Sequence, residues 1–284
     1  YQLGQDNNRG SKMKILITGH KGFIGSNLYD YLKEDHEIVG WEWTKGFPSL
    51  KSIDAVIHLG AISSTTYSDV DQIVFQNYDF SKSLLNEAIA QKVKIFQYAS
   101  SASVYGDTDH FIEEGPLKPQ SPYAWTKYLF DKHIRETSLS KDIIVQGFRY
   151  FNVYGRKGEE HKKDMASPYT KFTNQALNKK EIILFESSEQ FKRDFVCVED
   201  VCEVHKQMLN KTKSGIFNVG TGVPVSFEAV GRKIAKKYNS QVNYIPMPEN
   251  LKKQYQKFTK ANVEKLESYV DISWKNILDY IDDV

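Results

Sequence analysis

The chain has 284 residues, of which 40% are hydrophobic and 13% aromatic, and it carries 38 basic against 36 acidic side chains. This apolar content can fill a core, which excludes a disordered chain, and the length allows one large domain or one domain with an extra lobe. A net charge of +2 excludes a strongly basic nucleic-acid-binding surface. No apolar run approaches the ~18 residues that a membrane span needs, and two cysteines fit a reducing compartment. We therefore expect a cytoplasmic protein with no nucleic-acid or membrane partner, and no His/Cys/Asp spacing suggests a metal site.

Up to about residue 155, apolar runs alternate with segments of helical periodicity. We expect strands over 14–18, 36–43, 54–59, 93–99 and 142–150, and helices over 22–33, 69–91 and 122–137. This alternation with short connections predicts a parallel sheet covered by helices on both faces, the doubly wound Rossmann-like architecture of the α/β class. The polar segment 1–12 lacks such a pattern, and we expect it to be a tag or a disordered leader.

The pattern changes after Gly155, where a charged stretch over 156–164 precedes shorter elements. We expect helices over 167–179, 199–210 and 226–238, strands over 182–186, 194–198, 215–219 and 242–246, and two short C-terminal helices. Residues 13–155, which begin with a strand and a glycine-rich turn that suits a dinucleotide, are therefore expected to form an NAD(P)-binding Rossmann domain. Residues 156–284 are expected to form a smaller α/β substrate-binding lobe, some segments of which are interleaved with the first domain.

Three glycines, Gly19, Gly22 and Gly25, follow the first expected strand and open a helix. This arrangement gives a tight turn, lets the backbone approach a pyrophosphate and directs a helix N-terminus at its negative charge. About 20 residues further on, Glu42 ends the second strand, where an acid bonds the adenosine ribose and disfavours a 2′-phosphate. Lys21 beside the second glycine could instead approach such a phosphate, so the loop predicts NAD or NADP.

Tyr123 and Lys127 lie four positions apart on an expected helix, so both side chains project from one face. A lysine ammonium beside a tyrosine stabilises the phenolate and lowers the pKa of the tyrosine, which suits the pair to proton transfer. Ser101, after the preceding apolar run, can hydrogen-bond the same substrate oxygen. The pair alone is a weak signal, but together with the glycine loop and Ser101 it predicts an active site that uses a dinucleotide.

The order of these motifs resembles the extended short-chain dehydrogenase/reductase family, which includes the NAD-dependent epimerases and dehydratases, over residues 13–284. The matching segments are 18–25, 58–61, 100–106, 123–127, 149–155, 193–201 and 217–221. Dehydratases of this family carry an Asp-Glu pair after the active-site Ser or Thr, whereas this chain has Ala102 and Ser103. The resemblance therefore implies an epimerase or a reductase.

Segments in the C-terminal part narrow the resemblance within the family. Residues 184–186, 191–195, 245–252 and 255–259 are similar to those of the ADP-L-glycero-D-manno-heptose 6-epimerases. That likeness implies a nucleotide-sugar substrate and redox-neutral epimerisation at C6 through a transient ketone, with one tightly bound NAD or NADP per chain. Asp164 and Lys171 depart from the pattern of these epimerases. Another nucleotide-sugar epimerase or reductase, such as a UDP-hexose 4-epimerase or a GDP-heptose enzyme, therefore stays open.

The resemblance also implies roles for individual residues. Tyr123 and Lys162 match two bases that serve the two epimers, while Ser101 would hold the C6 oxygen and Lys127 would contact the cofactor ribose and Tyr123. With the glycine loop included, the expected cofactor contacts are Gly19, Gly22, Phe23, Ile24, Gly25, Glu42, Leu59, Gly60, Ala61, Asn77, Lys127 and Val153. The expected substrate contacts are Ser63, Ser64, Asn152, Phe185, Glu186, Ser187, Ser188, Arg193 and Tyr255. By the same analogy we expect a homo-oligomer.

The connection between the second strand and the strand that ends at His58 is short. Only residues 44–53 join them, and a crossover with its own helix needs about a dozen residues or more. The strand 3 region of the usual order 3-2-1-4-5-6 is therefore expected to be deleted, which leaves the second strand at the sheet edge. Because that unit normally contributes adenine contacts, we expect a more open adenine pocket covered by Glu42 and the Trp41 or Trp43 ring.

Overall fold

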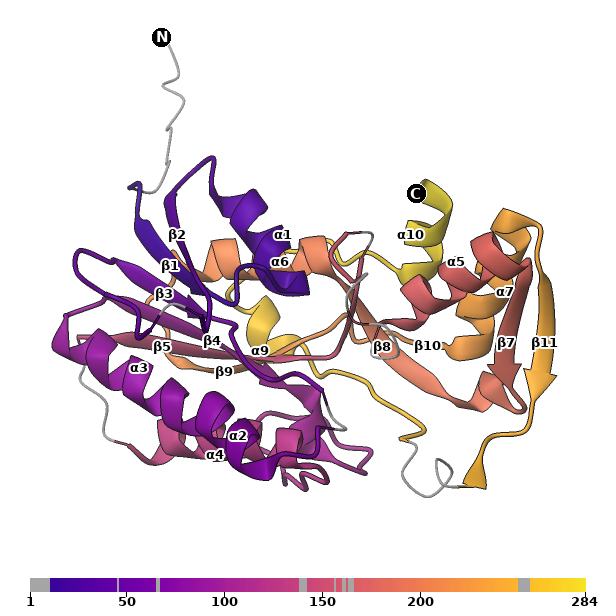
Figure 1. The fold of residues 1–284 in the computed structure, drawn as a ribbon, viewed down its shortest axis with the longest axis horizontal. Helices are drawn as coiled ribbons and strands as arrows, with labels where there is room; N and C mark the ends of the chain where they lie inside the picture. The colour runs from indigo at the N-terminus through magenta and orange to yellow at the C-terminus, as the bar shows by residue number, and fades with distance from the viewer. Residues whose placement is uncertain are drawn as a thin grey trace, which may run out of the picture.

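The larger part of the molecule contains a six-stranded parallel sheet (Figure 1). The computed structural model describes residues 11–44, 46–64, 67–137, 142–155, 157–159, 162, 166–249 and 256–284. In spatial order, the strands are β2 (Glu37–Trp41), β1 (Lys14–Thr18), β3 (Ala55–His58), β4 (Ile95–Ser101), β5 (Ile144–Tyr150) and β9 (Gly215–Val219). The Rossmann-like α/β fold predicted from the sequence is therefore confirmed.

Helices cover both faces of this sheet. On one face α1 (Phe23–Leu32) packs beside α6 (Val198–Met208), and on the other lie α3 (Phe80–Ala90) and α4 (Pro122–Glu136). Successive residues of β1 serve the two faces in turn, because side chains alternate along a strand. Leu16 packs against α3 and α4, whereas Ile15 and Ile17 pack against α1.

The helix expected over 69–91 is present, but a π-helical turn interrupts it. The segment consists of α2 (Val70–Val74), the turn η1 (Phe75–Asp79) and α3. π-Turns inside helices are frequently found at functional sites. Here the turn contains the buried Asn77, whose side-chain amide bonds both the N–H and the C=O of Ile62 in the loop after β3, at 2.8 and 2.9 Å.

The strand 3 region is absent from the sheet, as the short connection predicts, and β2 forms the edge. The described residues between β2 and β3 form turns and irregular structure, without a helix or strand. The Trp41 ring stacks on Phe80 at 5.1 Å, and the Trp43 ring lies 4.3 Å from Phe80 between ring centres. Trp41 is 5% exposed and donates a hydrogen bond to Gly46 O, so its ring belongs to the core beneath this edge.

The smaller lobe is built from two short sheets and the helices that pack on them. The first sheet has the order β10 (Pro224–Ser226), β8 (Lys192–Cys197), β6 (Asn152–Tyr154), and the second pairs β11 (Gln241–Ile245) with β7 (Glu181–Phe185). The helices are α5 (Pro168–Lys179), α7 (Phe227–Tyr238) and α10 (Ile277–Asp283), while α9 (Glu264–Glu267) lies against β9. The three-residue strands β6 and β10 were not predicted, because such short runs show little periodicity.

The two parts are interleaved along the chain. β9 and α6 come after β7 in sequence, yet they complete the six-stranded sheet and cover one of its faces (Figure 1). Across the described ranges, the helices are all too short or too polar to span a membrane.

Candidate active site

The turn between β1 and α1 requires glycine at two positions. Gly19 has φ +71°, and a Cβ there would lie 2.8 Å from the Gly60 Cα. A Cβ on Gly25 would lie 2.0 Å from the Gly19 carbonyl oxygen, so no other residue fits. Gly22 caps α1 without a side-chain hydrogen bond, and the first turn of α1 carries no acidic residue. The N–H groups at this helix end therefore suit a pyrophosphate, which is the fit that a dinucleotide needs.

Glu42 lies at this loop, immediately after β2. Its Oε1 accepts a hydrogen bond from the Lys21 N–H at 2.8 Å and lies 3.2 Å from His20 Nδ1. The structure thus brings a carboxylate beside the glycine loop, where it also holds the loop in place. The loop and the end of β2 are further joined by the hydrogen bond from Gly19 N–H to Trp41 O, at 3.0 Å.

The other expected cofactor contacts gather around the end of β3. Gly60 N–H donates to Thr18 Oγ1 at 3.1 Å, which fixes the loop containing Leu59 and Ala61 against the end of β1. Leu59, Ile24 and Val153 pack against the same apolar cluster, and Phe23 and Gly22 lie in the adjoining turn. Asn77 does not project from the π-turn as a free amide. It is committed to Ile62 and to Thr126 on α4, at 3.2 Å, and so links the loop after β3 to the helix of Tyr123.

Helix α4 begins just before Tyr123, because Ser121 caps it through the Ala124 N–H and Pro122 occupies its first turn. Ser101, at the end of β4, is near enough to Tyr123 to lower the pKa of its hydroxyl. One turn on, Lys127 Nζ donates to the Ala99 carbonyl at 2.8 Å and lies 5.8 Å from the centre of the Tyr123 ring. The predicted Ser101–Tyr123–Lys127 group is therefore assembled at one place.

Burial sets the protonation of this group. It lowers the pKa of Lys127 to about 8, with the Asp131 carboxylate acting in the opposite direction. Burial raises the pKa of Tyr123 and Ser101 lowers it only in part, so the net lowering expected from the sequence is not found, because desolvation outweighs it. At neutral pH the pair therefore holds a tyrosine hydroxyl beside a lysine ammonium, poised to transfer a proton to or from a bound oxygen.

Lys162 lies at the start of α1 and is tied to the start of α5. Its Nζ is 4.3 Å from the centre of the Phe23 ring and 3.6 Å from Glu159 Oε1. Glu159 is buried and accepts hydrogen bonds from the N–H and Oγ of Ser167, at 3.1 and 2.5 Å, and from Thr170 Oγ1 at 2.6 Å. Burial lowers the pKa of Lys162, and the Glu159 carboxylate opposes that shift. The structure therefore brings Lys162 to the glycine loop.

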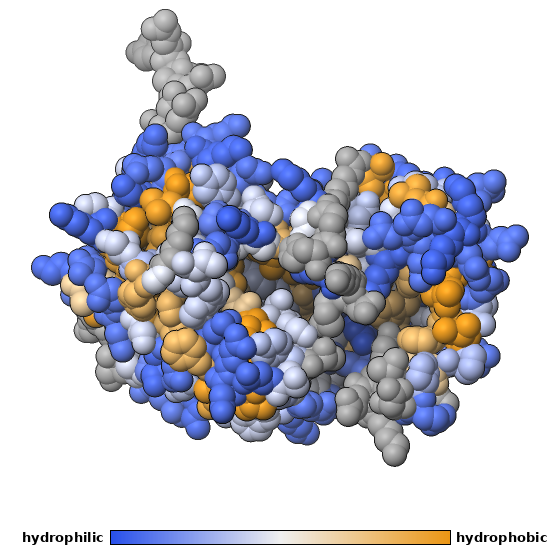
Figure 2. All heavy atoms as spheres, in the orientation of Figure 1, coloured by the Kyte–Doolittle hydropathy of each residue, from blue (hydrophilic) through white to orange (hydrophobic). Residues whose placement is uncertain are grey.

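A cavity of about 590 Å³ opens in the smaller lobe between α5, β7, β8 and α7. Of the expected substrate contacts, Asn152, Phe185, Ser188 and Arg193 line it. Ser188 is 1% exposed, and among the described residues its hydroxyl has no hydrogen-bond partner. The Arg193 guanidinium lies 5.5 Å from the centre of the Phe227 ring and donates to the carbonyls of Lys192 and Gln256. Figure 2 shows the surface hollowed between this lobe and the larger part.

The remaining expected substrate contacts lie elsewhere. Glu186 and Ser187 form the turn before the 3₁₀ helix η4 (Ser188–Gln190) and do not line the cavity. Ser63 and Ser64 lie in the loop after β3, on the larger part. Tyr255 falls outside the described residues.

Several cavity residues were not singled out as substrate contacts from the sequence. They are Ala166, Pro168, Lys171, Phe172, Gln175, Ile183, Leu184, Phe191, Phe227 and Ile245. The available signal was on α5, where Lys171 and Gln175 lie four residues apart and therefore share a face. From the sequence alone, this pair cannot be told apart from two polar residues on a solvent-exposed helix face. Only the packing of β7 and α7 beside α5 shows that the pair lines a cavity.

Comparison with known proteins decides the family. A profile of the NAD-dependent epimerase/dehydratase family matches residues 15–220. The chain belongs to this family. It is accordingly an enzyme of the NAD-dependent nucleotide-sugar epimerase/dehydratase class, which confirms the resemblance stated from the motifs.

Solved structures agree over almost the whole chain. The ADP-L-glycero-D-manno-heptose-6-epimerase of Helicobacter pylori is 28% identical with a TM-score of 0.83, covering 98% of this chain and 96% of that one. The UDP-N-acetylglucosamine 4-epimerase of Methanobrevibacter ruminantium is 22% identical with a TM-score of 0.85, covering 96% of each chain. The UDP-glucose 4-epimerase of Thermotoga maritima is 23% identical with a TM-score of 0.78, covering 90% of this chain and 92% of that one. The last two show the shared fold.

Proposed function

We propose that this family member is an epimerase that inverts C6 of an ADP-linked glycero-manno-heptose without net oxidation. The observation that carries the proposal is the presence of two partly desolvated proton-transfer groups, one beside the end of β4 and one at the glycine loop. Tyr123 lies near Ser101 and Lys127, and Lys162 lies against Phe23 at the start of α1. The 28% identity to a heptose 6-epimerase over 98% of the chain, lobe included, supports the same choice.

Two bases suit an epimerisation at a carbon outside the sugar ring. NAD, when bound, supplies the acceptor and later the donor of the C6 hydride. In its phenolate form, which the Lys127 ammonium stabilises, Tyr123 removes the proton of the C6 hydroxyl, and Ser101 holds the oxygen. When the oxygen of the ketone is protonated again after its side chain has turned, Lys162 would be the residue that donates the proton. Tyr123 then releases a proton to solvent and Lys162 takes one up, so both side chains return to their starting protonation states with no net gain or loss of protons.

The lobe cavity suits the nucleotide portion of the substrate. Arg193 and Lys171 bring two cations to it, and an arginine fork matches phosphate oxygens. Phe172, Phe227 and Ile245 supply apolar wall for a base. We propose that the diphosphate lies at Arg193, which holds the sugar towards Tyr123.

The position of Glu42 favours NAD over NADP. Its carboxylate is fixed at the glycine loop by the Lys21 N–H, and a 2′-phosphate there would meet a like charge. The test is the identity of the dinucleotide released when the purified protein is denatured. The proposed homo-oligomer is tested on the same sample by light scattering.

Lys171 favours a second candidate. It lines the cavity at a position where the sequence departs from the heptose 6-epimerases, so another nucleotide-sugar fits the same chemistry. A UDP-hexose 4-epimerase or a GDP-heptose epimerase or reductase would use the same Ser101, Tyr123 and Lys127.

The deciding experiment is product analysis by NMR. The protein is incubated with ADP-D-glycero-D-manno-heptose, and in parallel with UDP-glucose and UDP-N-acetylglucosamine. We expect inversion at C6 of the heptose, with no net change in absorbance at the reduced-nicotinamide band and no deuterium from D₂O at C6. Stoichiometric oxidation of added NADH would identify a reductase, and inversion of only the UDP sugars would identify a 4-epimerase.

A further inference from the structure

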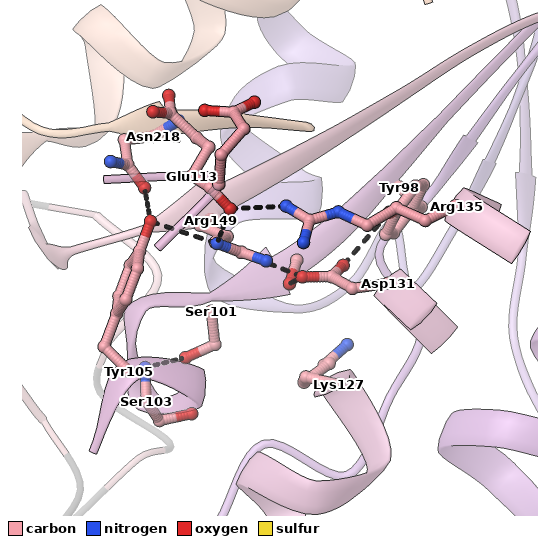
Figure 3. Close-up of polar contacts among 12 residues, drawn as sticks. Tyr98, Ser101, Ser103, Tyr105, Glu113, Lys127, Asp131, Arg135, Arg149 and Asn218 are labelled. Carbon is pink, nitrogen blue, oxygen red and sulfur yellow. Dashed lines mark hydrogen bonds and ion pairs between the residues drawn. The ribbon is translucent and has the colours of Figure 1, made fainter. Parts of the chain in front are cut away.

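A buried charge cluster lies directly behind Lys127 and Ser101 (Figure 3). At its centre the Asp131 carboxylate, which is fully buried, accepts three hydrogen bonds. They come from Tyr98 OH at 3.0 Å, Ser100 Oγ at 3.0 Å and Arg149 Nε at 2.9 Å. Asp131 therefore ties α4 to β4 at two points and to β5 at a third.

Arg149 extends the cluster away from α4. Its Nη1 donates to Tyr105 OH and to the Glu113 carbonyl, both at 3.1 Å. Tyr105 OH in turn donates to Asn218 Oδ1 at 2.6 Å, and the Glu113 carboxylate, 1% exposed, accepts the Asn218 N–H at 2.8 Å. The cluster thus joins β4, β5 and β9 at the edge where the active site lies.

Stability alone does not require these charges. A buried ion pair is costly to desolvate, and apolar residues of similar volume often stabilise a fold as well or better. Arg149 has no exposed surface, and its Nη2 has no hydrogen-bond partner among the described residues, so the cluster is not fully compensated. Such a cluster is therefore better explained by the field and geometry that it imposes on its neighbours.

Those neighbours are the catalytic candidates. Asp131 is one helical turn beyond Lys127, and Ser100 immediately precedes Ser101. The groups that face Lys127 are Tyr123 and Asp131 from α4, His58 from β3 and, through Asp131, Arg149 from β5. Burial lowers the pKa of His58 to about 3, so this imidazole is neutral and Asp131 supplies the negative charge.

We propose that Asp131 is a positioning residue that keeps Lys127 protonated and fixes Ser101 and Lys127 relative to Tyr123. Arg149 holds the Asp131 carboxylate in the orientation that this requires. The inference rests on the proposed roles of Lys127 and Tyr123, whose proton transfer would depend on the negative charge of Asp131.

The first test is the pH dependence of kcat for Asp131→Asn, which keeps the shape and removes the charge. Loss of a negative charge, with Arg149 left unpaired, lowers the proton affinity of both Lys127 and Tyr123. The acid limb of the profile should therefore move down by about one pH unit. Asp200→Asn is the matched control, because Asp200 is also buried, accepts the Lys275 N–H at 2.8 Å and lies on α6 away from Lys127. A fall in rate at all pH values with no shift of the limb would overturn the proposal.

The second test does not depend on knowing the substrate. The pKa of Lys127 is read from the NMR titration of ¹³Cε-labelled lysine, with the signal assigned by its loss in Lys127→Met. Asp131→Asn should lower that pKa by about one unit, whereas Asp200→Asn should leave it unchanged. An unchanged pKa in Asp131→Asn would refute the inference even if the proposed function holds. A shifted pKa in a protein that epimerises none of the sugars would refute the function alone.

A third variant covers the case in which Asp131→Asn does not fold. Tyr98→Phe with Ser100→Ala removes two of the three donors to Asp131 and keeps its charge. With fewer donors to neutralise it, the carboxylate acts more strongly on Lys127, so the pKa of Lys127 should rise. A pKa that stays constant or falls would contradict the assignment.

Discussion

In the larger part of the molecule, the glycine loop, Gly60 and Ser101 stand at or just beyond strand ends, whereas the smaller lobe collects its cavity from separate elements. Gly19 follows β1, Gly60 follows β3 and Ser101 ends β4, so parallel strands deliver them to one edge. The cavity of the lobe is lined from α5, β7, β8, α7 and β11, so no single short motif contains all of its residues. The motif residues of the larger part are therefore placed by the backbone of the sheet, whereas the proposed substrate contacts of the lobe are brought together by packing between elements.

The largest effect should come from removing the proton-transfer group of the larger part. Tyr123→Phe retains the ring and loses the hydroxyl near Ser101, so kcat for epimerisation should fall about 1,000-fold. Tyr128→Phe, on the same helix, is the matched control and should retain the rate. Stopped-time NMR assays of both variants measure this. Equal rates in the two variants would show that Tyr123 is not catalytic.

The glycine loop tests whether backbone geometry carries cofactor binding. In Gly25→Ala the added methyl group would lie 2.0 Å from the Gly19 carbonyl oxygen, so the turn must open. We expect NAD to bind about 100-fold more weakly, which corresponds to about 2.7 kcal/mol, as measured by isothermal titration calorimetry. Gly215→Ala serves as the control, since its nearest contact would be 3.3 Å from the Phe217 side chain, away from the loop. Unchanged NAD affinity in Gly25→Ala would show that cofactor binding does not depend on the backbone geometry of the glycine loop.

Acid should weaken the larger part through a histidine that is buried in its neutral form. His205 on α6 contacts Gln97 Oε1 at 2.6 Å and Tyr150 OH at 2.5 Å, and burial lowers its pKa to about 3. Below pH 6.5 the unfolded chain takes up a proton that folded His205 does not accept. The free energy of unfolding should thus fall as pH decreases, by about 2 kcal/mol from this group between pH 7.5 and 5.0.

Urea unfolding at the two pH values measures this loss. His205→Gln should lessen the decrease, because the variant has no proton to gain on unfolding at this site. The exposed His110, changed to Gln, provides the control and should leave the decrease as it is. The same decrease in wild type and His205→Gln would assign the acid sensitivity to other groups.

The smallest effect is expected in the lobe, where several side chains share the binding. Lys171 is exposed at the cavity, so Lys171→Gln should not disturb the fold. Loss of a charge-assisted hydrogen bond to the nucleotide should raise KM about 10-fold and leave kcat within about twofold. Lys179→Gln, at the far end of the same helix, should leave both constants unchanged. Steady-state kinetics with the preferred sugar provide the measurement, and a loss in kcat instead would place Lys171 among the catalytic groups.

Much of the larger part could be predicted because its signals are local. Buried parallel strands are continuous apolar runs, the glycine loop lies within seven residues, and Tyr123 and Lys127 share one helix face. The deleted strand 3 region was predictable as well, because chain length limits what 44–53 can span. The π-turn at Asn77 was not, since its hydrogen bonds depend on Ile62 and Thr126, which are distant in sequence.

The sequence by itself therefore determined the first five strands of the sheet, its edge at β2 and the positions of Gly19, Tyr123 and Lys127, because periodicity and spacing act over a few residues, whereas the tertiary structure decided that β9 joins this sheet. Only the tertiary structure decided that Trp41 belongs to the core, that Lys171 faces a cavity and that Asp131 binds Arg149 behind Lys127. These outcomes depend on burial and on contacts between elements far apart in the chain. The pKa shifts that burial causes depend on the final packing around each group, so they could not be predicted from a pattern in the sequence.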